Sequence, residues 1–369
     1  MILVVANTII GKQGNIGYRI AKVFEKEDQS NYIMLARGLE GSFSGYSYGF
    51  FGFLSRCLNG VRRYAIPKFN SRKYDIYLFN FVTILHYHFY IKSKYTIKTV
   101  YLCETSVFLI HFFRKQGFFI VLDIPIAPNR HVKNILKNYD VPEFYYNTFL
   151  DKQEMACLRI ADRIITPSDY IKDMIASIYH NADVRKISFG VDYDNSVKDS
   201  VYLKKRKYFT FGYLGNVSPR KGCNQLLDAW AIKNEFSDSR LLLQGKLYPG
   251  FKDKLINSKV DYRPFGDKKT FFESIDVMVL PSFMEGSAKV IYEALACGKQ
   301  VYVSEYSGAP YIDNYGIHLL NSLDPVNLSN QLNSIEENYI GPLDKRYVEK
   351  FVNYYSWENY ARQVRALLV

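Results

Sequence analysis

Two glutamates, Glu285 and Glu293, are separated by seven residues within the segment PSFMEGSAKVIYEALACG, which spans 281–298. The apolar run before them reads as the end of a buried strand, and apolar residues at helical spacing predict a helix over 287–297. A strand that enters a helix through a glycine-containing loop leaves amides unpaired at the helix start, and such an end binds anions, phosphate above all. Eight residues would span roughly 12 Å along a helix axis, so the pair suits a long ligand held at two points with a phosphate between them. The unpaired amides would belong to Gly286, Ser287 and Ala288.

An ordinary amphipathic helix is the alternative for this segment. In that case Glu293 would pair with Lys289, one turn earlier on the same helix. Lysine N-terminal to glutamate is the weaker order for such a pair, which would contribute only a few tenths of a kcal/mol.

Two adjacent cations, Arg220 and Lys221, stand at a second helix entry in NVSPRKG, residues 216–222. This segment follows an apolar strand over 209–215, and Gly222 permits close backbone approach. A guanidinium and an ammonium in this setting suit a diphosphate. The alternative is an exposed basic turn. It is the weaker interpretation, because the segment follows the first strand of a domain.

The two glutamates at this spacing, followed by EALACG, resemble the donor-site signature of retaining glycosyltransferases of family 4. That family has the GT-B fold, an α/β architecture of two Rossmann-like domains that face each other across a cleft. The resemblance implies that Glu285 lies near the transferred sugar, that Glu293 hydrogen-bonds the ribose of a sugar nucleotide, and that the amides after Glu285 hold the diphosphate. It is strong from about Glu154 to the C-terminus and only architectural before that.

The PRKG segment resembles the second donor motif of the family, in which an arginine and a lysine hold the diphosphate. Many members have Gly-Arg where this chain has Gly215 and Asn216. The resemblance therefore implies that Arg220 takes the arginine role, while Lys221 matches directly. The segment that ends at Gly266 is implied to border the nucleotide base.

Breaking the anomeric bond of a sugar nucleotide places negative charge on the departing diphosphate. We expect Arg220, Lys221 and the helix-start amides to stabilise this leaving group, with Glu285 orienting the sugar hydroxyls. These groups would replace the metal of other transferases, so no metal and no cofactor are expected besides the donor substrate. Because no nucleophile is evident, the resemblance implies front-face attack assisted by the leaving phosphate.

The first half of the chain offers candidates on the acceptor side. A loop with Gly14 and Gly17 follows the N-terminal strand, but it lacks the GxGxxG spacing of dinucleotide-binding loops. The resemblance gives these glycines an acceptor-facing role, and a plain tight turn explains them equally. Many family members carry a histidine after the strand that here ends at Asp123, and the nearest one in this chain is His131, for which packing is the alternative role.

Composition defines the class of protein. The chain has 369 residues, 48% hydrophobic and 23% charged, with a formal net charge of +12, which predicts two globular domains and anionic partners. Five cysteines without CxxC spacing argue against a disulfide framework or a metal site. The N-terminal apolar run is too short for a signal peptide and no stretch approaches the roughly 20 residues of a membrane span, so a cytoplasmic location is expected.

Aromatic and basic residues interleave over 41–69. This pattern predicts a loop that leads into an amphipathic helix suited to docking on an anionic membrane. A cleft-lining loop whose aromatics pack inside the domain explains it equally. Nucleic acid is not an expected partner, because the basic residues are dispersed and no recognition motif is present.

Strand-type apolar runs alternate with helical patterns, which predicts parallel sheets. We expect an N-terminal acceptor-side domain over 1–195, a C-terminal donor domain over 196–350, and a last helix over 351–369 that crosses back to the first domain. The expected strands cover 2–7, 31–37, 75–80, 99–104, 118–123, 163–168, 186–192, 209–215, 241–244, 275–280 and 301–304.

The sequence thus predicts a retaining, metal-independent, hexosyltransferase-like glycosyltransferase. It would move a sugar from a nucleoside-diphosphate sugar to a glycan or lipid-linked acceptor, in bacterial envelope polysaccharide synthesis. Two alternatives stay open: a non-catalytic protein that binds anionic membranes or nucleotides on a GT-B scaffold, and a sugar-nucleotide epimerase, although the epimerase signature is absent.

Overall fold

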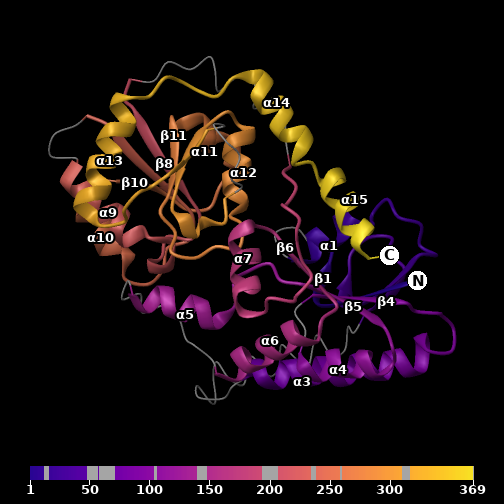
Figure 1. Ribbon diagram of the computed structural model, residues 1–369. Coiled ribbons are helices and arrows are strands. Elements are labelled where there is room, and N and C mark those ends of the chain that lie inside the picture. Colours follow the sequence, from indigo (N-terminus) through magenta and orange to yellow (C-terminus); the bar gives the residue numbers. More distant parts are fainter. Residues whose placement is uncertain are drawn as a thin grey trace.

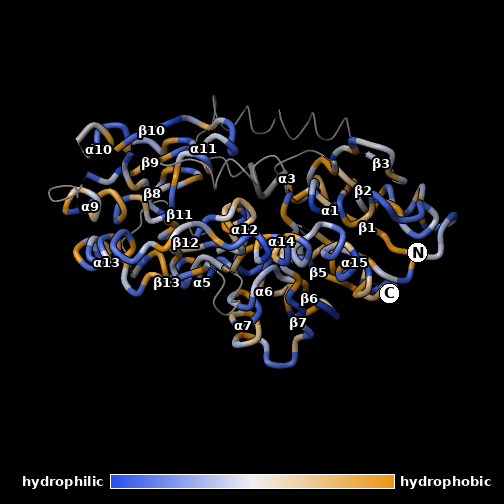
Figure 2. The backbone as a smooth tube through the Cα atoms, turned by 90° about the horizontal axis from the view of Figure 1, so that it is seen from above, coloured by the Kyte–Doolittle hydropathy of each residue, from blue (hydrophilic) through white to orange (hydrophobic). Residues whose placement is uncertain are grey.

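The structure is a computed structural model of the chain, and it describes residues 1–11, 16–47, 57, 71–103, 106–138, 148–192, 207–233, 238–257, 260–309 and 316–368. Two lobes lie side by side, each an open sheet covered by helices (Figure 1). Seen from above, α12 (Lys289–Ala296) and α14 (Lys345–Tyr354) lie near the junction of the lobes (Figure 2).

The N-terminal lobe is built on a seven-stranded parallel sheet in the order β3-β2-β1-β4-β5-β6-β7. On β1, Leu3 and Val5 belong to one hydrophobic cluster and Val4 and Ala6 to another, because successive side chains of a strand point to opposite faces. Both faces of the sheet are therefore buried, as is usual for parallel sheets. The strands are β1 (Ile2–Ile10), β2 (Tyr32–Leu39), β3 (Gly45–Ser47), β4 (Thr99–Cys103), β5 (Phe119–Asp123), β6 (Arg163–Thr166) and β7 (Val184–Lys186).

One predicted strand of this lobe is wrong, because residues 75–80 lie inside helix α3. Phe79 and Val82 are buried whereas Phe81 is 59% exposed, which is the spacing of a helix that packs on one face. Short apolar runs look alike in buried strands and in helices, so the sequence pattern alone could not separate them. The helices are α1 (Ile16–Phe24), α3 (Ser71–His86) with its π-helical extension η1 (Tyr87–Ile91), α4 (Val107–Lys115), α5 (Asn129–Asn138), α6 (Thr148–Ile160) and α7 (Asp169–Ile178).

The C-terminal lobe repeats this design with six parallel strands in the order β10-β9-β8-β11-β12-β13. Trp230 is buried in its core, with the centre of its ring 5.8 Å from the centre of the Phe211 ring on strand β8. The strands are β8 (Thr210–Leu214), β9 (Arg240–Gln244), β10 (Asp261–Arg263), β11 (Val277–Leu280), β12 (Gln300–Val303) and β13 (Ile317–Leu319). The helices, besides α12, are η2 (Pro219–Lys221), α9 (Cys223–Lys233), α10 (Phe251–Asn257), α11 (Lys268–Ser274), η3 (Glu305–Ser307) and α13 (Pro325–Glu337).

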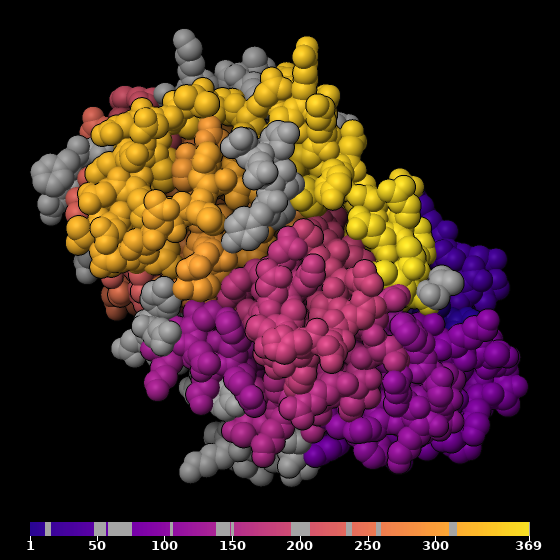
Figure 3. Space-filling view, viewed as in Figure 1, coloured from indigo at the N-terminus to yellow at the C-terminus, as the bar shows by residue number. Residues whose placement is uncertain are grey.

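The chain returns to the N-terminal lobe through α14 and α15 (Trp357–Leu367), and the yellow C-terminal segment lies across both lobes (Figure 3). The amide of Val191, which follows β7, donates to the carbonyl of Tyr355 at 2.8 Å, and Val191 also bridges to Ser356. The outgoing and returning connections therefore lie side by side at this point.

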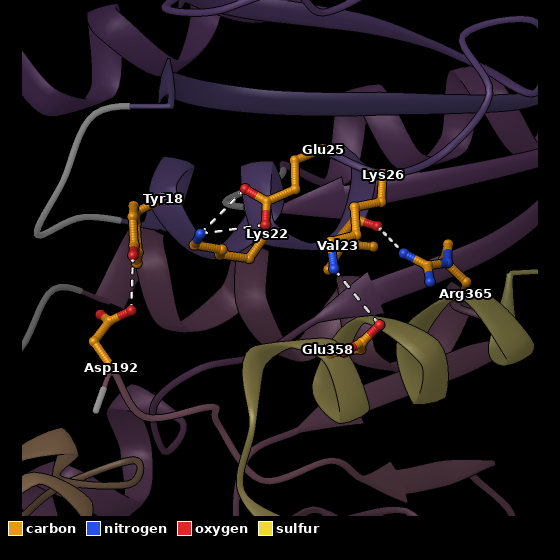
Figure 4. A network of polar contacts seen from close by, with 8 residues as sticks. All are labelled: Tyr18, Lys22, Val23, Glu25, Lys26, Asp192, Glu358 and Arg365. Atoms are coloured by element: carbon orange, nitrogen blue, oxygen red, sulfur yellow. Dashed lines mark hydrogen bonds and ion pairs between the residues drawn. The ribbon is translucent and has the colours of Figure 1, made fainter. Parts of the chain in front are cut away.

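Helix α15 packs against α1 (Figure 4). The Arg365 guanidinium donates to the carbonyl of Val23 at 2.6 Å, and Lys26 lies 3.6 Å from Glu358. These contacts attach the end of the chain to the first helix of the N-terminal lobe.

The other predicted strands are found close to their expected positions, except that β7 ends at Lys186, so most of the run 186–192 is not a strand. Gly14, most of the segment 41–69 and the predicted boundary at 195 lie outside the described residues. None of the helices in the described ranges has the length and apolar character needed to cross a membrane.

Candidate functional site

A cleft of about 540 Å³ lies between the two lobes. Its walls come from α1, from the turns that follow β5, β7, β8 and β10, and from the start of α12. The carboxyl ends of parallel strands in both sheets thus face one space, which is where open α/β sheets bind ligands. Four cations and two carboxylates line it, so the cleft suits an anion: Arg19, Lys221, Lys268, Lys289, Glu285 and Glu293.

Gly222 brings the PRKG turn against the loop that follows β11. It has φ +70°, and a Cβ at this position would overlap the carbonyl oxygen of Pro281, so the close approach requires glycine. The amide of Phe283 donates to the carbonyl of Arg220 at 3.0 Å across the same contact. The two motifs, distant in sequence, therefore share one corner of the cleft.

The three residues expected to act in catalysis meet at this corner. Lys221 Nζ forms an ion pair with Glu285 Oε1, and both side chains are mostly buried. The Arg220 guanidinium lies 4.0 Å from the same oxygen and donates to the carbonyl of Met284 at 2.7 Å. Glu285 thus neutralises the positive charge that would attract a diphosphate.

The loop before α12 differs from expectation in one of its three amides. The amide of Ala288 donates to the carbonyl of Ser307 at 3.3 Å, and that of Glu285 donates to the carbonyl of Tyr306 at 2.9 Å. The helix itself begins at Lys289, so Glu285 stands in the loop and not on the helix. The prediction that the Ala288 amide is available to an anion is therefore wrong, because the η3 segment occupies it.

The other two amides, those of Gly286 and Ser287, have no hydrogen-bond partner within the described part of the chain. Ala288 is the N-cap of α12 and supplies no side-chain hydrogen bond, and the Ser287 hydroxyl is engaged with that of Tyr292 at 2.9 Å. An uncapped helix start with unpaired amides next to it is an anion-binding arrangement.

Gly286 also touches the N-terminal lobe. The Ser168 hydroxyl donates to its carbonyl at 2.7 Å, and a Cβ on Gly286 would overlap the carbonyl oxygen of Pro125. The loop that offers amides to an anion is therefore also a contact between the lobes.

Glu293 lies on α12 with its carboxylate toward α11. Its Oε1 accepts a hydrogen bond from Lys268 Nζ at 2.6 Å, and the Glu293 side chain is 20% exposed. The alternative pairing with Lys289 is not formed, because the Lys289 side chain turns toward the N-terminal lobe. Glu293 is thus held at the rim of the cleft, in reach of a ligand.

The turns after β8 and β10 form the far wall of the cleft. Gly215 has φ +151° and its amide donates to the carbonyl of Gln244 at 2.9 Å. Gly266 and Phe265 line the cleft next to it, and Phe265 is 61% exposed. An exposed ring beside two glycines offers a flat apolar surface in an otherwise charged space.

A buried ion pair supports the opposite wall. Arg19 on α1 donates to Asp123 Oδ2 at 2.7 Å, and the two side chains are 4% and 1% exposed. The Tyr101 hydroxyl donates to the same oxygen at 2.6 Å. Burial acts to lower the pKa of Arg19, but the Asp123 carboxylate together with Tyr360, Tyr101 and Cys103 raises it by more, so the pKa of Arg19 is raised and the guanidinium stays charged.

Comparison with known proteins agrees with this arrangement. Residues 194–352 match the sequence family described as glycosyl transferases group 1. A sucrose-phosphate synthase from Thermosynechococcus elongatus superimposes with a TM-score of 0.66 at 16% identity over 99% of this chain and 97% of its own. An Anabaena protein solved in complex with UDP and glucose gives a TM-score of 0.61 at 14% identity over 100% and 98%. The chain has the GT-B fold.

A curated relative is an uncharacterised glycosyltransferase from Methanocaldococcus jannaschii, 26% identical over 219 residues. The matched region covers 56% of this chain and 58% of that relative. The similarity in sequence is thus regional, whereas the GT-B fold extends over the whole chain.

Two acceptor-side candidates are not part of the GT-B cleft as described. His131 lies on α5 with its ring 6.3 Å from that of Tyr170, and burial lowers its pKa. Tyr170 in turn faces Tyr306 of the other lobe at 6.3 Å. Gly17 is buried within α1. His131 therefore packs beside an interlobe contact.

Sequence reasoning missed three cations that line the GT-B cleft. Lys268 stands at the first position of a helix capped by Asp267, and a capping residue before a lysine gave no functional signal. Arg19 stands two residues after Gly17 among the mostly apolar residues of α1, and its charge is a usable signal. For Lys289 the sequence alone suggests only a pairing with Glu293. Across the described ranges, no group of three or more histidine, cysteine or acidic side chains is placed to hold a metal ion.

Proposed function

We propose that the protein is a glycosyltransferase that takes its sugar from a nucleoside-diphosphate sugar. The observation that carries the proposal is the convergence of Lys221, Glu285, the uncapped start of α12 and Glu293 around one interlobe cleft. Each part of a sugar nucleotide would find a suitable group here. Glu285 would bind the sugar, Lys221 and the amides would bind the diphosphate, and Glu293 would bind the ribose. The match of residues 194–352 to glycosyl transferases group 1 supports the same assignment.

The donor half of the cleft supports a metal-independent, retaining reaction of family 4 type. Lys221 and Arg220 would leave Glu285 and bind the diphosphate, stabilising the charge that develops as the anomeric bond breaks. Glu285, once released, would accept hydrogen bonds from the sugar. A uridine nucleotide and a hexose are the donor components we favour, because the Anabaena neighbour holds UDP and glucose.

The acceptor would enter along the N-terminal lobe and be a glycan or a lipid-linked saccharide of bacterial envelope polysaccharide synthesis, at the inner face of the membrane. The net charge of +12 supports an anionic environment for the protein.

Nucleotide binding tests this proposal directly. Isothermal titration with UDP and GDP should show binding of at least one of them, and Glu293→Gln should weaken it by about 10-fold to 100-fold, since a hydrogen bond to a charged group is lost. Glu358→Gln on the exposed face of α15 serves as the control and should bind like the parent protein. Absence of affinity for either nucleotide would refute the proposed donor.

Membrane contact is proposed through the helices that follow the segment 41–69 in the sequence. Helices α3, η1 and α4 expose large aromatic side chains, and the turn that follows η1 exposes Lys92 and Lys94. Aromatic side chains together with cations suit the interface of an anionic bilayer. The exposed aromatic residues are Tyr77, Phe81, Phe89, Tyr90 and Phe108.

Vesicle sedimentation checks this surface. The protein should bind vesicles that contain phosphatidylglycerol and not those of phosphatidylcholine alone, and Phe81→Ser with Phe89→Ser should reduce the bound fraction about 10-fold, because apolar contact area is lost. Ile340→Ser, which alters a 94% exposed side chain of the other lobe, should leave binding unchanged. If Ile340→Ser lowers the bound fraction as much as the double phenylalanine variant does, this surface is not the membrane contact.

A further inference from the structure

Lys289 is the first residue of α12, and its side chain crosses from the C-terminal lobe toward aromatic rings of the other side. Its Nζ lies 5.2 Å from the centre of the Trp357 ring, 5.8 Å from that of Phe189 and 5.9 Å from that of Tyr18. The ammonium thus faces the cleft from within a group of three rings, here called the aromatic box.

Within the described residues, this ammonium forms neither a hydrogen bond nor an ion pair. The nearby carboxylates are engaged elsewhere. Glu293 accepts from Lys268, and Asp192 accepts from the Tyr18 hydroxyl at 2.9 Å (Figure 4). Rings attract the positive charge of an ammonium, but they do not replace an oxygen acceptor for its N–H groups.

A second cation stands next to it. Arg19 lines the same part of the cleft, with its guanidinium 5.0 Å from the centre of the Phe189 ring that Lys289 also faces. Burial lowers the pKa of Lys289, and the charge of Arg19 acts in the same direction, whereas Glu293 and Asp192 act against it. Two cations that face the same ring and line the same part of the cleft favour an anion there.

A ligand that fills this part of the cleft must bring an oxygen to the Lys289 ammonium, because a buried cation without an acceptor is costly. The diphosphate of a donor already has Arg220, Lys221 and the amides of Gly286 and Ser287 on the other wall. Lys289 is therefore not needed by the donor diphosphate, and Arg19, although paired with Asp123, adds positive charge beside it.

We propose that Lys289 and Arg19 form an anion subsite on the acceptor side of the cleft, which takes a phosphate or carboxylate group carried by the acceptor. The inference rests on the proposed function and adds to it the chemical class of the acceptor. The aromatic box holds the ammonium in place before the acceptor arrives, so that less conformational freedom is lost on binding.

The test uses methyl phosphate and acetate as probes, titrated at constant ionic strength into protein saturated with the nucleoside diphosphate that it binds. Lys289→Gln is compared with the parent protein, with Lys289→Arg, and with Lys252→Gln, which removes one exposed charge of the same lobe outside the cleft. Arg19 is left intact because it neutralises Asp123.

We expect at least one probe to bind the nucleotide complex of the parent protein, of Lys289→Arg and of Lys252→Gln. Lys289→Gln should bind that probe about 10-fold or more weakly, as the loss of a charge-assisted hydrogen bond implies, and should bind the nucleotide within about threefold of the parent.

Three results would overturn the inference. A nucleotide affinity that falls about 10-fold in Lys289→Gln would assign the ammonium to the donor diphosphate. A lowered unfolding temperature with unchanged probe binding would make Lys289 an interlobe contact alone. Failure of both probes to bind the nucleotide complex would leave no second anion subsite.

If the parent protein binds no nucleotide, the proposed function fails instead, and the same titration into the free protein still decides whether Lys289 binds an anion.

Discussion

Replacing Lys221 by alanine is expected to reduce sugar transfer about 100-fold to 1000-fold, the effect of removing one preorganised group that stabilises developing negative charge. Lys221 Nζ lies at the corner where the PRKG turn meets the loop after β11, paired with Glu285. The loss should appear mainly in kcat, because the charge on the leaving diphosphate grows in the transition state. Initial rates with a panel of nucleotide sugars, together with nucleotide affinity by titration, measure both quantities.

The Lys221→Ala variant also leaves the Glu285 carboxylate without its main partner, so a second variant is needed to interpret it. Adding Glu285→Gln removes the unpaired charge. If the missing cation alone causes the defect, the single and double variants bind the nucleotide with equal affinity. If the unpaired carboxylate repels the diphosphate, nucleotide affinity recovers in the double variant. Lys252→Ala is the control for net charge, and near-normal transfer by Lys221→Ala would dismantle the site assignment.

Removing the Asp123 carboxylate is expected to cost about 3 to 5 kcal/mol of unfolding free energy, because Asp123→Ala leaves the Arg19 guanidinium buried without its counter-charge. The Tyr101 hydroxyl would lose its acceptor at the same time. Urea unfolding followed by tryptophan fluorescence measures the change, since Trp357 lies against the N-terminal lobe beside Tyr18.

Glu25→Ala is the matched control for this experiment. Glu25 forms a solvent-exposed pair with Lys22 next to the same helix, and such pairs contribute about 0 to 1 kcal/mol. A difference of less than about 1 kcal/mol between the two variants would contradict the view that the buried pair supports the cleft wall.

The clustering of the residues proposed for the donor could be predicted because they are close together in sequence. Arg220 and Lys221 are neighbours, and Glu285 and Glu293 belong to one loop and helix. The pattern of charges near a helix start is therefore enough to identify them from the local sequence. The same reasoning failed for Lys289. A helix considered alone pairs it with Glu293, whereas the folded protein supplies Lys268 from α11 for the glutamate and three rings for the lysine.

The acceptor half could not be predicted for a related reason. Arg19, Phe189 and Trp357 come together only when α1, the segment after β7 and α15 have packed, and nothing in their local sequence indicates this. For the glycines of the N-terminal loop and for His131, the only sequence signal is their position along the chain. His131 instead fills space beside Tyr170, as many partly buried histidines do.

The backbone contact between Val191 and Tyr355 has a mechanical consequence. Because the outgoing and returning chains are hydrogen-bonded at one place, we expect them to bend together, so that the cleft would open mainly by rotation about this place. The separation of two labels, one on each lobe, would then follow the whole movement as one coordinate. A ligand that contacts only one lobe should change that separation little. A ligand that contacts both lobes should shorten it.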